Sequence, residues 1–228
     1  MLKNPFEALP EKTADGSFTL KLMYYNEQYH SLHGALQESK HVFIKHGLRS
    51  FTVLPNPVYI LEIGLGTGLN AFLTGREALL QKDTVFYDAI EAFPLKKTVT
   101  DLLDYPSLFP EEWTQELFDA IHQAETDQTK NLKSNFFIRC FFQKLQEVTL
   151  EDEKYHLVYF DAFGPDTQPE MWTPEIFTKV SASMKSGGKL VTYCVKGTVQ
   201  RAMRAAGLKV EKLPGPPGKR EICRAIKP

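Results

Sequence analysis

A glycine run directly behind an acidic residue is the part of this sequence best suited to chemistry. Residues 58–70 read VYILEIGLGTGLN, in which Glu62 is followed by Gly64, Gly66 and Gly68. Glycine lacks a Cβ, so the backbone can turn sharply and approach a ligand that a side chain would block. A helix that starts behind such a turn leaves free N–H groups facing the same ligand. The pattern therefore predicts a binding turn between a strand and a helix.

The spacing and the acid narrow the choice of ligand. A dinucleotide fingerprint needs a third glycine where this sequence has Leu69. Glu62 would repel a pyrophosphate, but it could hold the cationic ammonium of an amino acid. The pattern E-x-G-x-G-x-G resembles the first motif of class I S-adenosylmethionine (SAM) methyltransferases. This resemblance implies that SAM is the cofactor, with its methionine part held by Glu62, by the backbone of Gly64, Gly66 and Gly68, and by Asn70.

Strands and helices alternate along the rest of the chain, as the glycine turn requires. Strands are predicted from the apolar runs at 58–63, 84–91, 135–142, 155–162, 189–195, 208–213 and 220–226. Helices are predicted at 68–81, 94–103, 111–124, 172–184 and 198–206. Single crossovers imply a mostly parallel sheet with helices on both faces. The short loop before the last strand requires one antiparallel member. The predicted fold is α/β, a Rossmann-like class I methyltransferase sheet of seven strands.

Residues 1–57 do not continue this alternation. A strand is predicted at 16–25 as part of a hairpin, and Pro55 and Pro57 mark the entry to the main domain. We therefore expect an N-terminal extension with β structure over 1–57 and a SAM-dependent methyltransferase domain over 58–228. The histidines of the extension lack the H-E-x-x-H spacing of a zinc helix, so no metal is predicted.

Two further acids fall at the carboxyl ends of predicted strands, where ligands bind in open α/β sheets. Glu91 ends the second strand, 27 residues after Gly64. An acid at this position hydrogen-bonds the ribose hydroxyls of a nucleotide. Asp161 lies at the carboxyl end of the fourth strand, where a carboxylate would face both the reactive end of the cofactor and the acceptor. Helix capping is the structural alternative for Asp161.

Composition and charge limit the class of protein and the ligands that the chain can bind. The 228 residues are 43% hydrophobic and 24% charged, as in an ordinary globular protein. No apolar run approaches the roughly 20 residues that span a bilayer, and the N-terminus lacks a signal-peptide layout, so we expect a cytoplasmic protein. Residues 179–228 carry twelve lysines and arginines against two acids. This basic end suits phosphate binding, and a solvated helix face is the alternative.

Three segments resemble one methyltransferase family. Residues 161–172 (DAFGPDTQPEMW), 192–196 (TYCVK) and 215–223 (GPPGKREIC) look like the methyltransferase domain of the MnmC family, the bifunctional tRNA 5-methylaminomethyl-2-thiouridine biosynthesis proteins. The N-terminal pattern that runs from Tyr29 to Phe43 is also similar, so the resemblance covers nearly the whole chain. It implies methylation of the 5-aminomethyl group on a wobble uridine of tRNA.

The resemblance also implies roles for residues near the acceptor. Asp161 would orient the attacking amine and help its proton depart. Tyr29 and Phe163 would form the pocket wall or stack on a flipped uracil, with core packing as the alternative for both. Phosphate contacts are expected from the basic residues Lys196, Arg201, Arg204, Lys219 and Arg220.

The sequence departs from the family pattern in two places. Gln143 and Lys144 stand where the family has a Gly-Asp pair whose acid lies by the adenine. The FAD-dependent oxidase half, which removes a carboxymethyl group, has no counterpart. The expected substrate is therefore 5-aminomethyluridine, thiolated or not, with a separate oxidase acting upstream.

Two other functions fit parts of the pattern. A spermidine-synthase-like aminopropyltransferase would share the sheet and the acid after the fourth strand, but it would need an acid-rich pocket for a polycation. The basic C-terminal end argues against it. A catalytically inactive tRNA-binding module is the second alternative, and it would not bind SAM.

Overall fold

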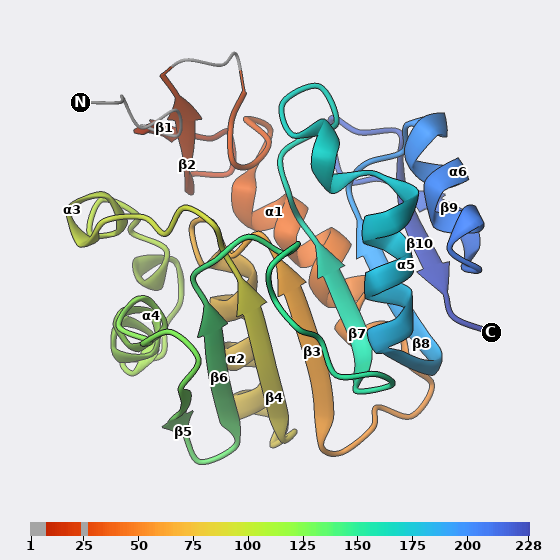
Figure 1. Cartoon of the computed structure of the whole chain (residues 1–228). Helices are drawn as coiled ribbons and strands as arrows, with labels where there is room; N and C mark the ends of the chain where they lie inside the picture. The colour runs from red at the N-terminus through yellow and green to blue at the C-terminus, as the bar shows by residue number, and fades with distance from the viewer. Residues whose placement is uncertain (1–7, 24–26) are drawn as a thin grey trace.

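A mixed sheet forms the centre of the molecule in the computed structural model, which describes residues 8–23 and 27–228 (Figure 1). Across the described residues its eight strands lie in the order β5 (Thr129–Lys133), β6 (Phe136–Phe141), β4 (Val85–Ile90), β3 (Val58–Ile63), β7 (Tyr155–Phe160), β8 (Met184–Thr192), β10 (Glu221–Ile226) and β9 (Lys209–Pro214). The five from β6 to β8 are parallel, and β10 runs antiparallel to both its neighbours. The predicted fold class is confirmed.

The edge strand β5 is the one strand of this sheet that the sequence analysis did not predict. It pairs antiparallel with β6 and has the sequence TKNLK, in which only Leu132 is buried. A polar edge strand carries neither the apolar run nor the alternation by which strands are recognised. The seven predicted strands are therefore all present, with β5 added beside them.

Helices cover both faces of the sheet (Figure 1). One face carries α2 (Leu69–Gln81), α4 (Thr114–His122) and α1 (Ala35–Ser39), which continues as a π-helix over Lys40–Lys45. The other face carries α5 (Pro174–Ser183) and α6 (Gly197–Ala205). Each face has its own apolar core, with Phe72 and Phe118 in the first and Phe177 and Met203 in the second. This is the two-sided burial expected of a parallel sheet.

Several short elements complete the described chain. They are α3 (Lys97–Thr100) and three 3₁₀ turns, η2 (Leu48–Ser50), η3 (Pro106–Leu108) and η4 (Pro169–Met171). The helix predicted over 94–103 is thus reduced to the single turn of α3. Thr173 caps α5, its side chain accepting a hydrogen bond from the N–H of Ile176, with Pro174 in the first turn. In the part of the chain that the model describes, no helix is long and apolar enough to cross a bilayer.

The N-terminal segment lies above the carboxyl ends of the parallel strands (Figure 1). Its strands β1 (Ala8–Lys12) and β2 (Phe18–Leu22) form a two-stranded antiparallel sheet. The predicted strand over 16–25 corresponds to β2, and the last two residues of that range lie outside the described part. Leu20, Val42 and Phe43 are buried in the same apolar cluster as β3 and α2. This packing holds the segment over the sheet edge where ligands bind.

Candidate active site

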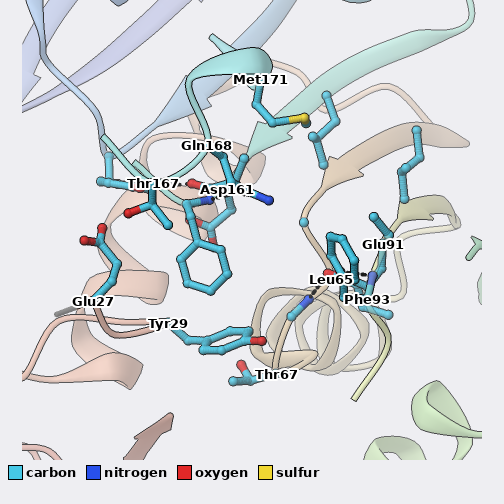
Figure 2. A pocket seen from close by; sticks show the side chains of 18 of the residues that line it. Glu27, Tyr29, Leu65, Thr67, Glu91, Phe93, Asp161, Thr167, Gln168 and Met171 are labelled. Atoms are coloured by element: carbon cyan, nitrogen blue, oxygen red, sulfur yellow. Dashed lines mark hydrogen bonds between the residues drawn. The ribbon is translucent and has the colours of Figure 1, made fainter. Parts of the chain in front are cut away.

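A cavity of about 870 Å³ opens at the carboxyl ends of the parallel strands. Its walls are the loops that follow β3, β4, β6 and β7, together with parts of residues 27–38 and Lys219. Figure 2 shows Glu27 and Tyr29 of the N-terminal segment on one side and Glu91 and Phe93 on the other. Its volume lies in the range of small-molecule sites, about 300–1,000 Å³. The cavity lies where the sequence analysis placed the ligand.

The glycine turn forms the floor of one end of the cavity. Gly64, Gly66 and Gly68 have φ angles of +89°, +50° and +73°, in the left-handed region that favours glycine. A Cβ on Gly64 would lie 2.6 Å from the backbone oxygen of Asp161, and one on Gly66 would lie 3.0 Å from the Tyr29 ring. The turn therefore needs glycine both for its shape and for the close approach of its neighbours.

Glu91 stands beside this turn, one residue beyond β4. One carboxylate oxygen accepts from the N–H of Gly66 at 2.9 Å, and the other accepts from the N–H of Phe93 at 2.8 Å. Burial raises the pKa of Glu91, and the two backbone donors oppose that shift. A carboxylate has about four acceptor positions, so Glu91 can still accept hydroxyl groups from a ligand.

Two acids and an amide form a short chain beneath the cavity. Asn70, in the first turn of α2, donates from Nδ2 to Glu62 Oε1 at 3.0 Å and to Asp161 Oδ2 at 2.8 Å. Asp161 lines the cavity, whereas Glu62 has no exposed surface and neither it nor Asn70 is part of the wall. The structure thus brings the three predicted residues together, but only the carboxyl of Asp161 reaches the open space.

The surroundings of Asp161 weaken it as an acid. Burial raises its pKa to about 7, and the nearby Glu38 adds to the rise, while Asn70 and Lys219 oppose it. The pKa of Glu62 lies well above its ordinary value, chiefly through burial and secondly through the charge of Asp161. At neutral pH, Asp161 can therefore either hold a proton or accept one.

Two aromatic rings form a wall beside Asp161. The rings of Tyr29 and Phe163 meet edge to face with centroids 4.8 Å apart. The loop holding Phe163 is fixed by the indole N–H of Trp172, which donates to the Phe163 carbonyl oxygen at 2.8 Å, and by Gln168, which accepts from its N–H at 3.0 Å. Both rings line the cavity, as the sequence analysis expected of a pocket wall.

Lys219, from the loop between β9 and β10, lines the cavity near Asp161. Its ammonium pairs with Glu38 and lies 4.3 Å from the centre of the Tyr193 ring. Glu38 is buried, and its other oxygen accepts from the N–H of Ser31 at 2.8 Å. The pair thus joins the loop between β9 and β10 to the N-terminal segment.

The other predicted phosphate contacts lie outside the cavity. Lys196 is exposed and pairs with Asp166 at 2.5 Å, on the loop that follows β7. Arg201 and Arg204 are exposed on α6, and Arg220 is exposed beside Lys219. Gln143 and Lys144, which replace the family's acid, do line the cavity beyond β6.

Several residues of the site were missed by sequence reasoning. Glu27, Glu38 and Gln168 all line the cavity, and the ring Nε2 of His30 lies 2.7 Å from the Thr67 hydroxyl in the glycine turn. Burial lowers the pKa of His30 to about 4, which keeps the imidazole neutral. These residues fall in no motif with a fixed spacing. The match of the N-terminal pattern to the family, which includes Glu38, was the available signal.

The fold and the site define a class. An open sheet with a glycine turn after its first strand, an acid after its second and an antiparallel strand near one edge is the architecture of class I methyltransferases. The model of the S-adenosyl-L-methionine-dependent methyltransferase family matches residues 110–228, just over half of the 228 residues. The chain belongs to this family.

Two curated relatives are similar over most of the chain. Both are named tRNA 5-methylaminomethyl-2-thiouridine biosynthesis bifunctional protein MnmC. The one from Leptospira interrogans is 31% identical over an alignment of 213 positions, and the match covers 87% of this chain and 32% of that protein. The one from Pseudomonas entomophila is 28% identical over an alignment of 217 positions, and the match covers 89% of this chain and 32% of that protein. The chain thus spans about a third of the length of these relatives.

Solved structures agree on the fold. MNMC2 from Aquifex aeolicus superposes with a TM-score of 0.75 at 24% identity, covering 99% of this chain and 74% of that one. Spermidine synthase from Thermotoga maritima gives a TM-score of 0.50 at 11% identity, covering 99% and 82%. These likenesses extend the shared fold to residues before 110.

Proposed function

We propose that this chain transfers a methyl group from SAM to the amine of 5-aminomethyluridine, thiolated or not, at the wobble position of tRNA. The names of the curated relatives support the substrate. The observation that carries the proposal is Asp161, a carboxyl with a pKa of about 7 beside the glycine turn in one cavity.

The proposed chemistry needs a neutral amine, because an alkylammonium has no lone pair. SAM, when bound, supplies a methyl group activated on a positively charged sulfur. Asp161 accepts a hydrogen bond from the amine and takes up the proton that leaves as the nitrogen–carbon bond forms and the carbon–sulfur bond breaks. The rest of the site aligns the two reactants and excludes water.

The residues present fit the cofactor. The backbone of the glycine turn, which lines the cavity over residues 64–67, suits its amino-acid end, and Glu91 suits the ribose hydroxyls. Gln143 and Lys144 line the wall beyond β6 where the adenine is expected. An amide can both accept from and donate to an adenine edge, so Gln143 can replace the carboxylate of the family pattern.

The acceptor end suits a nucleobase that carries an amine. Tyr29 and Phe163 offer ring surfaces for stacking on a splayed-out uracil. We place Lys196, Arg201, Arg204 and Arg220 on the surface that meets the tRNA backbone, where their charge gives salt-dependent binding. In this proposal residues 1–57 are an extension that covers the methyltransferase domain of 58–228, a separate FAD-dependent oxidase acts upstream, and the protein works in the cytoplasm.

Nucleoside mass spectrometry tests the proposal. Undermodified tRNA is incubated with the protein and SAM labelled on its methyl group, then digested and analysed. We expect a labelled methyl on 5-aminomethyluridine, and none after Asp161→Ala. SAM binding without transfer to any tRNA nucleoside would refute the proposed acceptor.

A second candidate is favoured by one observation. The acids Glu27, Glu38, Glu91, Glu147, Asp161 and Glu170 line the cavity against two lysines, Lys144 and Lys219. Such an excess of acids suits a polyamine as well as a single amine. Incubation with decarboxylated SAM and putrescine distinguishes the two, because only an aminopropyltransferase would form spermidine.

A further inference from the structure

Glu62, the acid of the glycine motif, is buried behind the cavity wall and not exposed in the cavity. From sequence, Glu62 was assigned to the ammonium of the cofactor. In the structure its side chain has no exposed surface and does not reach the cavity wall. Asn70 is 2% exposed and is likewise absent from the wall. Neither residue can touch a ligand in this arrangement of the chain.

The hydrogen bonds of this pair lead to Asp161. Both N–H groups of the Asn70 amide are used, one by Glu62 and the other by Asp161. Glu62 thereby fixes the orientation of the amide, and the amide in turn fixes one oxygen of Asp161. The residues come from β3, α2 and the loop after β7, so the arrangement depends on the fold and not on a local turn.

We propose that Glu62 and Asn70 are positioning residues, which orient the carboxyl of Asp161 from behind the cavity wall and do not contact the cofactor. This inference rests on the use of SAM in the proposed function. It moves the acid of the motif from cofactor binding to support of the acceptor end.

The surroundings of Asp161 show what the amide contributes. Around its carboxyl lie Glu38 from α1, Lys219 from the loop between β9 and β10, Tyr193 after β8, and Glu62 behind Asn70. The N–H of Asn70 stabilises the carboxylate form, so its loss makes Asp161 harder to ionise. A cationic cofactor placed nearby favours the carboxylate and expels the proton.

Calorimetry with SAM alone tests both parts of the proposal. Titrations in two buffers of different ionisation enthalpy, repeated from pH 5.5 to 8.5, give the dissociation constant and the protons released on binding. Because the pKa of Asp161 is about 7, we expect the wild-type protein to release about half a proton at pH 7. Asp161→Asn should release none, which assigns the proton.

Two variants separate the alternatives. Glu62→Gln keeps the volume and the acceptor for Asn70, so we expect the SAM dissociation constant to stay within about threefold of wild type. If Glu62 held the ammonium, loss of a charged hydrogen bond would weaken binding at least about tenfold. That result would overturn the inference.

Asn70→Ala tests the link to Asp161. We expect the pH midpoint of proton release to rise by about half a unit or more, because the carboxylate loses its donor. A midpoint unchanged from wild type would overturn the link. Asn70→Ser, which offers one hydrogen-bond donor where the amide offers two, repeats the test if the alanine variant fails to fold.

Thr74→Val is the matched control. Thr74 is also buried on α2, and its hydroxyl lies 3.3 Å from that of Tyr159 and bonds to neither acid. We expect it to leave affinity and proton release unchanged. The calorimetry contains no tRNA, so its result does not depend on the identity of the acceptor. A failure to methylate tRNA in the mass-spectrometry experiment would refute the proposed acceptor but not this inference. A wild-type protein that binds no SAM would refute both.

Discussion

The two ends of the cavity are built from different parts of the chain. The cofactor end consists of the glycine turn and Glu91, which directly follow the neighbouring strands β3 and β4. The acceptor end is formed by Tyr29 and Glu38, which precede β3, by Phe163, which follows β7, and by Lys219, which lies between β9 and β10. The order of the strands is enough to bring the residues of the cofactor end together. The residues of the acceptor end meet only when distant parts of the chain have folded against one another.

This difference predicts different sensitivities. The cofactor end is determined mainly by the backbone conformation of the glycine turn, so substitutions there should distort that turn. Side-chain charge and ring contacts dominate the acceptor end, so substitutions there should disturb transfer while SAM still binds. Asp161 belongs to both ends, because its backbone lies against Gly64 and its carboxyl is the group that we propose acts on the acceptor.

Asp161→Asn should give the largest effect. Removal of the proton acceptor without a change in volume should lower kcat for methyl transfer by about 10²–10⁴-fold. SAM affinity should change far less. The comparison is made with labelled SAM in single-turnover transfer and with calorimetric binding. Equal losses in kcat and in SAM affinity would show that the two ends are not separable at this residue.

Gly64→Ala should strongly destabilise the cofactor end. The new Cβ would meet the Asp161 backbone oxygen at 2.6 Å, at a φ of +89°. We expect a loss of about 3–5 kcal/mol in unfolding free energy from strain and overlap. Gly187→Ala is the control, since φ is +74° and nothing lies within 4 Å of its Cβ. It should cost about 1 kcal/mol in urea unfolding. Similar costs would show that the close approach at Gly64 is unimportant.

Lys219→Met should act on the acceptor end. It leaves the buried carboxylate of Glu38 without its cation, which should cost about 1–3 kcal/mol of unfolding free energy. KM for tRNA should rise while the SAM dissociation constant is retained. Lys212→Met, which breaks the exposed pair with Glu221, should leave the free energy of unfolding nearly unchanged. A weakened SAM affinity in Lys219→Met would contradict the separation of the two ends.

The pH dependence of stability tests the surroundings of Asp161 without any change to the acceptor. Folded Asp161 keeps its proton up to about pH 7, whereas the ordinary value is 3.8. Between these values Asp161 binds more protons in the folded protein than in the unfolded chain, so the stability that this residue contributes falls as pH rises from about 4 to 7. Asp161→Asn should flatten this slope in urea unfolding measured at several pH values. An unchanged slope would show that the carboxyl titrates near its ordinary value.

Sequence reasoning succeeded where neighbouring residues determine the structure. The glycine turn and Glu91 were placed correctly because strand ends in a parallel sheet meet at one edge. The bonds of Asn70 to Asp161, 91 residues apart, and of His30 to Thr67, 37 apart, carry no such local signal. The burial of Glu62 behind the wall was equally invisible, since one acid before a glycine turn reads the same in either position.

The Lys219–Glu38 pair also bears on the order in which the protein becomes competent during synthesis. Glu38 leaves the ribosome early, but Lys219 lies between β9 and β10 and emerges after every described strand except β10. Folding units form progressively from the N-terminal side as a chain is made. A nascent chain can therefore form the glycine turn and its neighbouring strands long before the acceptor end is complete. Until β9 and β10 have formed, the growing chain lacks the contact that closes the acceptor end.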